Sequence, residues 1–400
     1  MKLAYLTTLG ALALSTTAAH SGGWETGKLD TSFLYEDGNY VELSYGNLNY
    51  SVNGTTQAGI THPMAKDQTR TSFSGKFQLG DFDIGLTSFG SGAIQMDGQN
   101  TATIQTDMTA DFISSSTCAA MQAATAANPT VLACLPSVVP SADVKLDTQA
   151  IMGRYSFNDN WSATVGLRQA KLKASTVMTL AAEYAIDATN KTGMVYGIAY
   201  EIPKYALKVE VLQSEAIMMG LTGTASGVGL ATGVNSTLAA SSALAIPKAT
   251  TIKLQTGIAE DTLLMASAHR VGWAASQIVI DVNGVADFDT GSNFSDSTSY
   301  SVGLGRQVSE DTAVSLTYSW EDGSGAAATS PFTMSNGSKT LSAGVKHKID
   351  ALTISAGASY TKAGDVNVTH MAAPTVPSGY TASYAGNSVM AFGLKVGFNF

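Results

Sequence analysis

The feature that most constrains this chain is a strict alternation of apolar with small or polar residues along many short segments. In the last 11 residues, six apolar side chains alternate with five small or polar ones. Successive side chains of a β-strand point to opposite faces, so one face of this segment is apolar and the other is not. A strand of this kind suits a sheet with lipid on one side and water or protein on the other. The apolar members are Met390, Phe392, Leu394, Val396, Phe398 and Phe400.

The same alternation recurs upstream in pairs of segments that are joined by short turns. One pair, 341–349 and 352–360, flanks Asp350. Counting all such segments gives about fourteen strands, and the short turns alternate with long connections, as in bacterial outer-membrane barrels. We therefore predict an all-β fold, a transmembrane antiparallel β-barrel of about 14 strands with a short N-terminal luminal plug and long extracellular loops. The long connections are 53–67, 91–146, 173–191, 215–248, 275–296, 323–336 and 364–384, and to most of them, including the low-complexity 215–248, we assign no regular structure.

Composition excludes several other classes of protein. After the first 20 positions, no apolar run approaches the roughly 20 residues that a transmembrane helix needs. The net charge is −9 and no basic patch stands out, which argues against a nucleic-acid partner. The pattern favours one large all-β domain over several soluble ones.

The N-terminus predicts export, and with it a division into three parts. Lys2 precedes a short apolar stretch from Leu3 to Leu14, and small residues follow, so we expect cleavage after Ser21 or after Ala19. An uncleaved anchor helix is the alternative. We expect residues 1–21 to be a signal peptide, 22–38 a plug or hatch segment, and 39–400 the barrel, placed in the cell outer membrane. Residues 22–38 could instead hang as a periplasmic tail.

Two cysteines, Cys118 and Cys134, lie in one Ala-rich segment in which a short helix is plausible. In a protein that leaves the reducing cytosol, the pair favours a disulfide that staples a surface loop. A metal site is disfavoured because no His or second cysteine pair lies nearby, and the chain lacks the Cys-x-x-Cys of a redox site. We expect no metal and no cofactor.

Charged residues on the lumen face leave two interpretations open. Either they pair across the lumen or with the plug, or some of the basic groups hold an anionic headgroup such as a fatty-acid carboxylate. Gly90 and Gly92 close the third strand, where glycine indicates a kink or bulge, or else an ordinary loop start. The charged residues are Glu42, Arg154, Arg168, Glu201, Lys208, Glu210, Lys253, Lys346, Lys348 and Lys395.

Several short strings of residues follow one another along most of the mature chain. In their order and spacing they resemble the FadL family of outer-membrane transporters of hydrophobic compounds, which includes the toluene-uptake proteins. The chain looks closest to the alphaproteobacterial-type members of this family. The resemblance implies a monomeric fourteen-stranded barrel, an N-terminal hatch, an external hydrophobic groove, an internal pocket, and sideways release beside a kinked third strand. The strings are 34–46, 155–161, 197–203, 255–263 and 393–398.

Carried over position by position, Gly90 and Gly92 match the kink of the lateral gate. Trp24 to Asp37 match the hatch, in which we single out Trp24, Leu29, Phe33 and Leu34. The hatch is short here, and the Asn-Pro-Ala string that is typical of the family is missing, which puts the gating mechanism in doubt more than the fold.

The sequence thus predicts transport of long-chain fatty acids or similar hydrophobic molecules, with no covalent step. The residues expected to bind the ligand are Arg168, Lys253, Lys346, Phe89 and Trp273. We expect contact with outer-membrane lipid and lipopolysaccharide, recognition by the barrel-assembly machinery through the last strand ending at Phe400, and a monomer.

Three alternatives remain open from the sequence. A general diffusion porin for small polar solutes would need a charged constriction loop, which we do not find. An enzyme is disfavoured because none of the five His lies near a Gly-x-Ser-x-Gly elbow, and His269 is interpreted as a rim residue. A structural or adhesive barrel is compatible with the long Thr/Ser/Ala-rich loops.

Overall fold

The structure, a computed structural model, describes residues 23–56, 61–97, 141–178, 183–228, 235–277, 279–282, 290–292, 294–323, 332–370 and 380–400. The expected signal peptide and the pair Cys118 and Cys134 lie outside these residues, so the disulfide stays a prediction. No helix in the described part of the chain is long and apolar enough to cross a membrane. The helical turns are the short η3 (Ser32–Tyr35), η5 (Pro203–Tyr205) and η6 (Trp273–Ala275).

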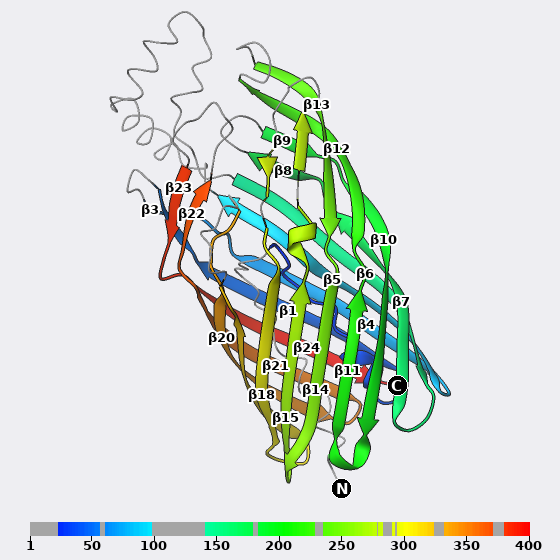
Figure 1. The fold of residues 1–400 in the computed structure, drawn as a ribbon. Helices are drawn as coiled ribbons and strands as arrows, with labels where there is room; N and C mark the ends of the chain where they lie inside the picture. Colours follow the sequence, from blue (N-terminus) through cyan, green and yellow to red (C-terminus); the bar gives the residue numbers. More distant parts are fainter. Residues whose placement is uncertain are drawn as a thin grey trace, which may run out of the picture.

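Fourteen antiparallel strands form a closed barrel, which confirms the predicted fold class (Figure 1). Along the chain, each of these strands pairs with the next, and the last pairs with the first. Closure leaves the barrel without a free edge whose backbone groups would be unpaired in lipid. The strands are β1 (Tyr40–Ser51), β4 (Gln68–Leu79), β5 (Phe82–Asp97), β6 (Ser141–Ser156), β7 (Trp161–Leu172), β10 (Thr189–Ile202), β11 (Leu207–Ser214), β14 (Ala249–Ala259), β15 (Thr262–Val271), β18 (Ser297–Gln307), β19 (Thr312–Glu321), β20 (Ser338–Ile349), β21 (Leu352–Ala363) and β24 (Ser388–Asn399).

The outside of the barrel is apolar, as the alternation predicts. In β24 the side chains of Phe392, Leu394 and Phe398 are exposed on the outer face, whereas Ala391 on the inner face is fully buried. In β20, exposed Leu341 and Val345 flank the inward-facing Ser342. Exposed apolar patches on soluble monomers rarely exceed a few hundred Å², so contact of this whole exterior with water would be unfavourable. The exterior therefore suits a hydrocarbon environment.

Short turns gather at the end of the barrel where the C-terminus lies (Figure 1). The β4–β5 turn places Gly80 at φ 65°, and the β20–β21 turn places Asp350 at φ 53°. Glycine and Asp tolerate this left-handed conformation, which a two-residue hairpin turn requires. Bacterial outer-membrane barrels have their short turns in the periplasm and their long loops outside the cell, so by this convention we name the turn end periplasmic and the opposite end extracellular.

At the other end the long connections continue the barrel wall, contrary to the prediction that most lack regular structure. In 215–248, β12 and β13 form a hairpin whose inner face is buried at Leu221 and Leu244. The sequence prediction was wrong here because a segment rich in Gly, Ser, Thr and Ala has the composition of a loop. Where no lipid contacts the outer face, that face needs no large apolar residues, so the alternation is weak. The extension comprises β8 (Ser175–Met178), β9 (Glu183–Ile186), β12 (Ile217–Val228), β13 (Asn235–Ile246), β16 (Val279–Val282) and β17 (Thr290–Gly291).

A separate four-stranded sheet lies at the same end (Figure 1). Its strands run in the order β22, β23, β2, β3, and its apolar side chains, among them Val368 and Tyr384, belong to the core that fills the extracellular end of the molecule. The strands are β2 (Asn53–Thr56), β3 (Thr61–Pro63), β22 (Val366–His370) and β23 (Tyr380–Tyr384).

Residues 23–38, hereafter the luminal segment, lie inside the barrel. Lys28 donates a hydrogen bond to Ser299 of β18, and Leu34 accepts one from Arg154 of β6. These two strands lie on different arcs of the wall, so the segment crosses the lumen. The luminal segment then continues through η3 to the start of β1.

Candidate functional site

The barrel wall is incomplete beside β5. Pairing between β4 and β5 runs from Leu79↔Phe82 to Ser72↔Phe89 and ends there, although both strands continue. On its other side β5 remains paired with β6, with a register shift between Gly90 and Gly92. A bulge bends its strand and strengthens the local twist, which turns β5 away from β4. The kink thus lies at the two glycines singled out from the sequence, and it accompanies a break in the wall.

The luminal segment occupies the edge of β5 that β4 vacates. The backbone N–H groups of Thr26 and Gly27 donate to the Ser91 carbonyl at 2.9 and 3.3 Å, and the Ala93 N–H donates to the Trp24 carbonyl at 3.0 Å. Glu25 and Gly92 form an antiparallel bridge. The start of the segment therefore acts as a short added strand, which satisfies backbone groups that the missing ladder would leave unpaired.

Two glycines permit this close approach. A Cβ on Gly27 would lie 2.2 Å from the Gly90 carbonyl oxygen, and a Cβ on Gly92 would lie 2.8 Å from the Trp24 ring. No side chain fits at either position without displacing the segment from β5. Gly92 therefore serves two purposes, the bulge in β5 and the contact with the luminal segment.

A small cavity of about 40 Å³ lies between the luminal segment and the arc of wall from β5 to β15. The luminal segment contributes Trp24 and Leu29. Most of the surface that lines the cavity is apolar, and the guanidinium of Arg168, on β7, belongs to the lining. We call this the apolar pocket; its wall residues include Phe89, Leu146, Leu212, Ile246 and Trp273.

Two hydrogen-bond donors in the lining of the apolar pocket have no partner. Arg168 is 9% exposed, and its Nη2 donates to the backbone carbonyls of Glu215 at 2.6 Å and Pro247 at 3.3 Å, but its Nε finds no acceptor among the described residues. The indole Nε1 of Trp24, a residue 4% exposed, likewise has none. A buried unsatisfied donor costs free energy, on the order of 1–3 kcal/mol. Both groups would gain from an oxygen acceptor in the pocket.

Aromatic rings separate the apolar pocket from a second small cavity on its extracellular side. The rings of Trp24 and Trp273 lie 6.3 Å apart, and Phe294 meets Trp273 edge-on at 5.8 Å. Trp24 lines both cavities, so its indole stands between them. The other apolar residues of this outer cavity, which also measures about 40 Å³, include Tyr50, Ile94, Phe332 and Met334.

His269 is part of the pocket lining and not a rim residue, so the sequence interpretation was wrong. It is 5% exposed, and its Nε2 lies 2.9 Å from a Glu25 carboxylate oxygen, while its Nδ1 lies 2.7 Å from the Thr251 hydroxyl. Its position in β15, two residues after Ser267 on the inner face, would have revealed this had the alternation been followed to the end of the strand. The chain Thr251–His269–Glu25 ties the luminal segment to β14 and β15.

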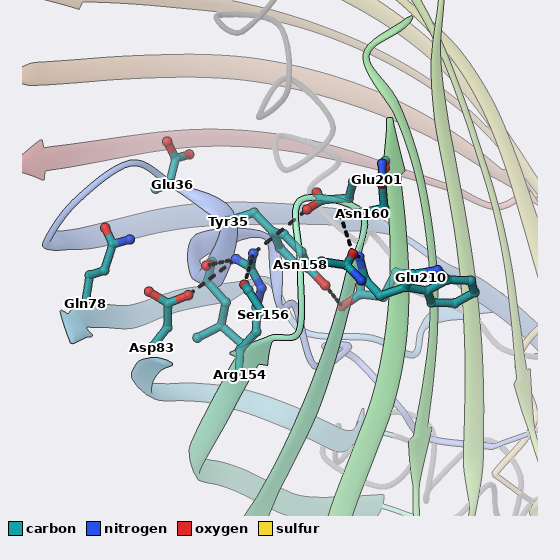
Figure 2. Close-up of polar contacts among 12 residues, drawn as sticks. Tyr35, Glu36, Gln78, Asp83, Arg154, Ser156, Asn158, Asn160, Glu201 and Glu210 are labelled. Atoms are coloured by element: carbon teal, nitrogen blue, oxygen red, sulfur yellow. Dashed lines mark hydrogen bonds and ion pairs between the residues drawn. The ribbon is translucent and has the colours of Figure 1, made fainter. Parts of the chain in front are cut away.

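The second half of the luminal segment is held by polar side chains of the wall (Figure 2). The Thr31 hydroxyl donates to Glu210 at 2.7 Å, and the Tyr35 hydroxyl donates to the same carboxylate at 3.1 Å. The Arg154 guanidinium lies 4.2 Å from the centre of the Tyr35 ring, and the Lys208 ammonium lies 3.9 Å from it. Burial, and then the charge of Glu210, raise the pKa of the Tyr35 hydroxyl, so it stays a donor.

One ion pair anchors the middle of the segment. Lys253 Nζ lies 2.9 Å from Asp30 and 3.5 Å from Glu210. Burial alone would raise the pKa of the Asp30 carboxyl, but the charges of Lys253 and Lys395 and the hydrogen bonds from Ser32 and Lys253 together outweigh burial and hold that pKa well below its usual value. Asp30 is therefore charged throughout the physiological range.

The structure brings most of the predicted site residues together. Arg168, Phe89 and Trp273 line the apolar pocket with Trp24 and Leu29. Phe33 and Leu34 lie deeper, in a buried cluster with Tyr40, Met152 and Leu212. Lys253 lies outside the apolar pocket because it binds Asp30, and Lys346 lines neither this pocket nor the outer cavity. Glu25 and Thr251 were missed, since neither follows a recognisable motif.

Most of the lumen charges pair with each other or with the luminal segment. Lys395 meets Glu42 at 3.2 Å, and Arg154 meets Asp83 at 3.4 Å. Lys253 is neutralised by the luminal segment through Asp30. Of the two interpretations of these charges, pairing therefore accounts for most of them, and Arg168 is the basic group that faces the apolar pocket.

No protein-family model and no curated protein matches the chain, but solved structures with a similar fold exist. The structure of a Pseudomonas aeruginosa FadL homologue superposes with a TM-score of 0.69 at 11% identity, covering 92% of each chain. The Pseudomonas putida toluene transporter TodX gives 0.61 at 13% identity over 95% of each chain. The Ralstonia pickettii toluene transporter TbuX gives 0.58 at 11% identity, covering 94% of this chain and 95% of that one. The fold predicted from the resemblance, that of the FadL family, is therefore confirmed.

Proposed function

We propose that this protein, which shares its fold with a FadL homologue and with toluene transporters, carries hydrophobic molecules across the outer membrane. The observation that carries the proposal is the apolar pocket, which lies beside a break in the barrel wall and contains two unpartnered donors, Arg168 Nε and Trp24 Nε1. A carboxylate would accept from both, and its alkyl chain, which is too large for a cavity of about 40 Å³, would contact Phe89 and Leu146 in the space that displacement of Trp24 opens. Long-chain fatty acids are thus the favoured substrate class.

The proposed route has three stages. A ligand binds first in a groove at the extracellular end, near the outer cavity lined by Tyr50, Ile94 and Phe294. Displacement of Trp24 then joins that cavity to the apolar pocket. From there the ligand leaves sideways between β4 and β5, where the ladder ends at Phe89, once the start of the luminal segment has left the edge of β5 that it occupies. A hydrophobic molecule that follows this route avoids a fully aqueous crossing, which would cost about 25 cal/mol for each Å² of apolar surface exposed.

The exterior supports an outer-membrane location. The protein is a closed barrel with an apolar outer face. The three solved structures of similar fold are described as a FadL homologue and two toluene transporters. A monomer, contact with lipopolysaccharide, and recognition of the final strand by the barrel-assembly machinery all belong to the proposal. In the same way, residues 1–21 remain the proposed signal peptide and 22–38 the proposed hatch.

The test is uptake in a host that lacks its own transporter of this kind. We expect cells producing the protein to take up radiolabelled oleate faster than cells with an empty vector. Arg168→Gln should lower oleate uptake by about tenfold or more, since a hydrogen bond to a charged group contributes about 1.5–3 kcal/mol. Toluene, which has no carboxylate, should be taken up equally by both forms.

Arg270→Gln is the matched control. Arg270 lies on the neighbouring rim, has a side chain 70% exposed and pairs with Asp296, so its loss should leave oleate uptake unchanged. The shift in mobility of unheated against boiled protein on gels checks that each variant is folded. Equal oleate uptake with and without the protein would contradict the proposal. A large open conductance in planar bilayers would favour the general porin instead.

A further inference from the structure

Glu25 places a negative charge in the lining of the apolar pocket. It lies in the part of the luminal segment that occupies the edge of β5, it forms a bridge with Gly92, and its side chain is 18% exposed. It also lines the outer cavity, so an arriving molecule meets Glu25 on both sides of the Trp24 ring. The hydrogen bonds that attach this stretch to β5 join backbone groups, and they need no charged side chain.

The contact of Glu25 with His269 orients the carboxylate and leaves its charge in place. An ionised carboxylate only accepts hydrogen bonds, so His269 Nε2 is the donor over the 2.9 Å between them. Nδ1 of the same ring can accept from the Thr251 hydroxyl, which lies 2.7 Å away. A neutral imidazole therefore satisfies both contacts, and in this state it does not compensate the charge of Glu25.

Arg168 supplies the opposite charge in the same lining. The charge of Glu25 acts on its guanidinium, whose Nη2 is held by the backbone carbonyls of Glu215 and Pro247. With Glu25 and Arg168 both ionised, the charges of the apolar pocket are balanced. A second carboxylate that accepts a hydrogen bond from Arg168 Nε, the unpartnered donor, makes the pocket negative.

The apolar pocket is too small to keep two carboxylates apart. Its volume of about 40 Å³ accommodates a few water molecules at most, so a carboxylate bound to Arg168 lies within a few ångströms of Glu25. Repulsion between two like charges roughly 5 Å apart in a protein shifts an equilibrium by about a hundredfold. The three backbone hydrogen bonds that hold the start of the luminal segment on β5 contribute a similar factor. The repulsion is therefore large enough to release it.

The released start of the luminal segment has room to move into. A larger cavity, of about 410 Å³, borders the segment from Thr26 to Ser32. Its lining includes Lys28 and Arg70, and the Arg70 guanidinium already donates to the Thr26 carbonyl. The charge of Glu25 also acts on Lys28. A shift toward this cavity therefore moves Glu25 away from an incoming anion and toward cations.

We propose that Glu25 makes the route selective for anionic amphiphiles, because the carboxylate of the ligand drives the start of the luminal segment off β5. This inference rests on the proposed function and deepens it. A ligand shifts an equilibrium only by its different affinities for the two states. A carboxylate binds Arg168 better once Glu25 has moved away, whereas an uncharged molecule gains nothing from that movement. An anionic ligand thus opens its own exit, and a neutral hydrocarbon depends on spontaneous opening.

Hydrogen exchange in the full-length protein, purified in a nonionic detergent, tests the proposal with two ligands of equal chain length. Oleate should accelerate exchange at the amides of Thr26, Gly27 and Ala93, which attach the segment to β5, by about tenfold or more. Oleyl alcohol, which is uncharged, should change these rates by less than about twofold. The Leu34 amide, bonded to the Thr31 carbonyl, is the internal control and should respond to neither ligand. Equal responses to the two ligands overturn the proposal.

Glu25→Gln and Glu25→Asp separate the charge of Glu25 from its contact with His269. The amide oxygen of Gln can accept the same hydrogen bond but carries no charge, whereas Asp keeps the charge on a shorter side chain. Oleate should therefore accelerate exchange at the Thr26 amide in Glu25→Asp and not in Glu25→Gln. Acceleration in Glu25→Gln shows that the residue is only a structural contact, and it overturns the proposal. The mobility of unheated protein on gels checks that each variant is folded.

Glu215→Gln is the matched control for the loss of a carboxylate near Arg168. The Glu215 side chain accepts a hydrogen bond from the Tyr196 hydroxyl at 2.5 Å and does not belong to the described lining of the apolar pocket. Its backbone carbonyl, the group that Arg168 uses, is unchanged by the substitution. Oleate should accelerate exchange at the Thr26 amide in this variant as in the wild type. Loss of the acceleration here would mean that the charge of Glu25 has no special role.

Uptake by cells gives a second measurement. In Glu25→Gln the bound carboxylate is no longer repelled and its exit is no longer driven. The oleate concentration for half-maximal uptake and the maximal rate should therefore both fall, each by about threefold or more. Failure of the purified wild type to bind oleate would refute the proposed function together with this inference. Oleate binding without accelerated exchange refutes the inference alone, so the two failures are distinguishable.

Discussion

The two halves of the luminal segment are held in different ways. The first half, around Trp24 to Gly27, is attached by backbone hydrogen bonds to Ser91, by aromatic packing and by the contact of Glu25 with His269. The second half, from Asp30 to Tyr35, is attached by the buried carboxylate of Glu210 and by cations of the wall. Detaching the first half breaks one such contact, that of Glu25, whereas detaching the second leaves buried Glu210 without Thr31 and Tyr35 and Lys253 without Asp30. If any part of the segment moves, this difference places the motion beside the break in the wall.

The largest effect should come from removing the anchor of the second half. Glu210→Ala takes away the acceptor of Thr31 and Tyr35 and one partner of Lys253, so we expect the free energy of unfolding to fall by about 3–5 kcal/mol, as when one member of a buried ion pair is lost. Urea unfolding in lipid vesicles measures it. Glu260→Gln, in an exposed turn, is the control and should change little. A loss below about 1 kcal/mol would show that the second half is not anchored by charge.

A smaller and more local effect should follow Gly27→Ala. The added Cβ meets the Gly90 carbonyl oxygen, so the first half must shift from β5 at a cost of about 1–3 kcal/mol. Hydrogen exchange should accelerate at the Thr26 amide, while the Leu34 amide, bonded to the Thr31 carbonyl, keeps its protection. Gly220→Ala is the control because its Cβ would meet nothing within 4 Å. Equal acceleration at both amides would mean that the two halves move as one.

The smallest effect should be a pH dependence confined to the second half. The folded pKa of Asp30 lies below its unfolded value of about 4, so its ion pair stabilises fully above that value and the stabilisation is lost as the pH falls below it. On gels, heating converts the mobility of the folded protein to that of the boiled protein at a transition temperature. Between about pH 6 and pH 3 this temperature should fall further in the wild type than in Asp30→Asn. An identical drop in both forms would exclude this ion pair as the cause.

The sequence predicted the barrel well because lipid enforces the pattern. A residue such as Phe392 or Leu394 on the outer face cannot be replaced by a polar one without cost, so the alternation is regular wherever a strand crosses the hydrocarbon. Beyond the membrane that constraint ends. β12 and β13 carry small polar residues on their outer face, and for this reason their hairpin was not predicted from the sequence.

The site was predicted only in part, because it depends on closure of the barrel. Arg168 and Phe89, on strands β7 and β5, and Trp273, in the helical turn η6, are far apart in the chain and were chosen by residue type. Their meeting with Trp24 follows from the path of the luminal segment, which no local pattern encodes. The alternation along β15 does place His269 on the inner face, but its partner Glu25, more than two hundred residues away in the chain, could not be predicted from a local pattern.

The pairing of the first strand with the last has a consequence for biogenesis. β1 bonds to β24 along its whole length, from Tyr40↔Asn399 to Ser51↔Ser388, and the Phe400 amide bonds to the Asn39 carbonyl. Until β24 is available, β1 has a free edge, and such an edge readily joins other chains. The barrel can therefore close only after residues 388–399 have been made. A chain that ends before Ser388 lacks the strand that completes the wall.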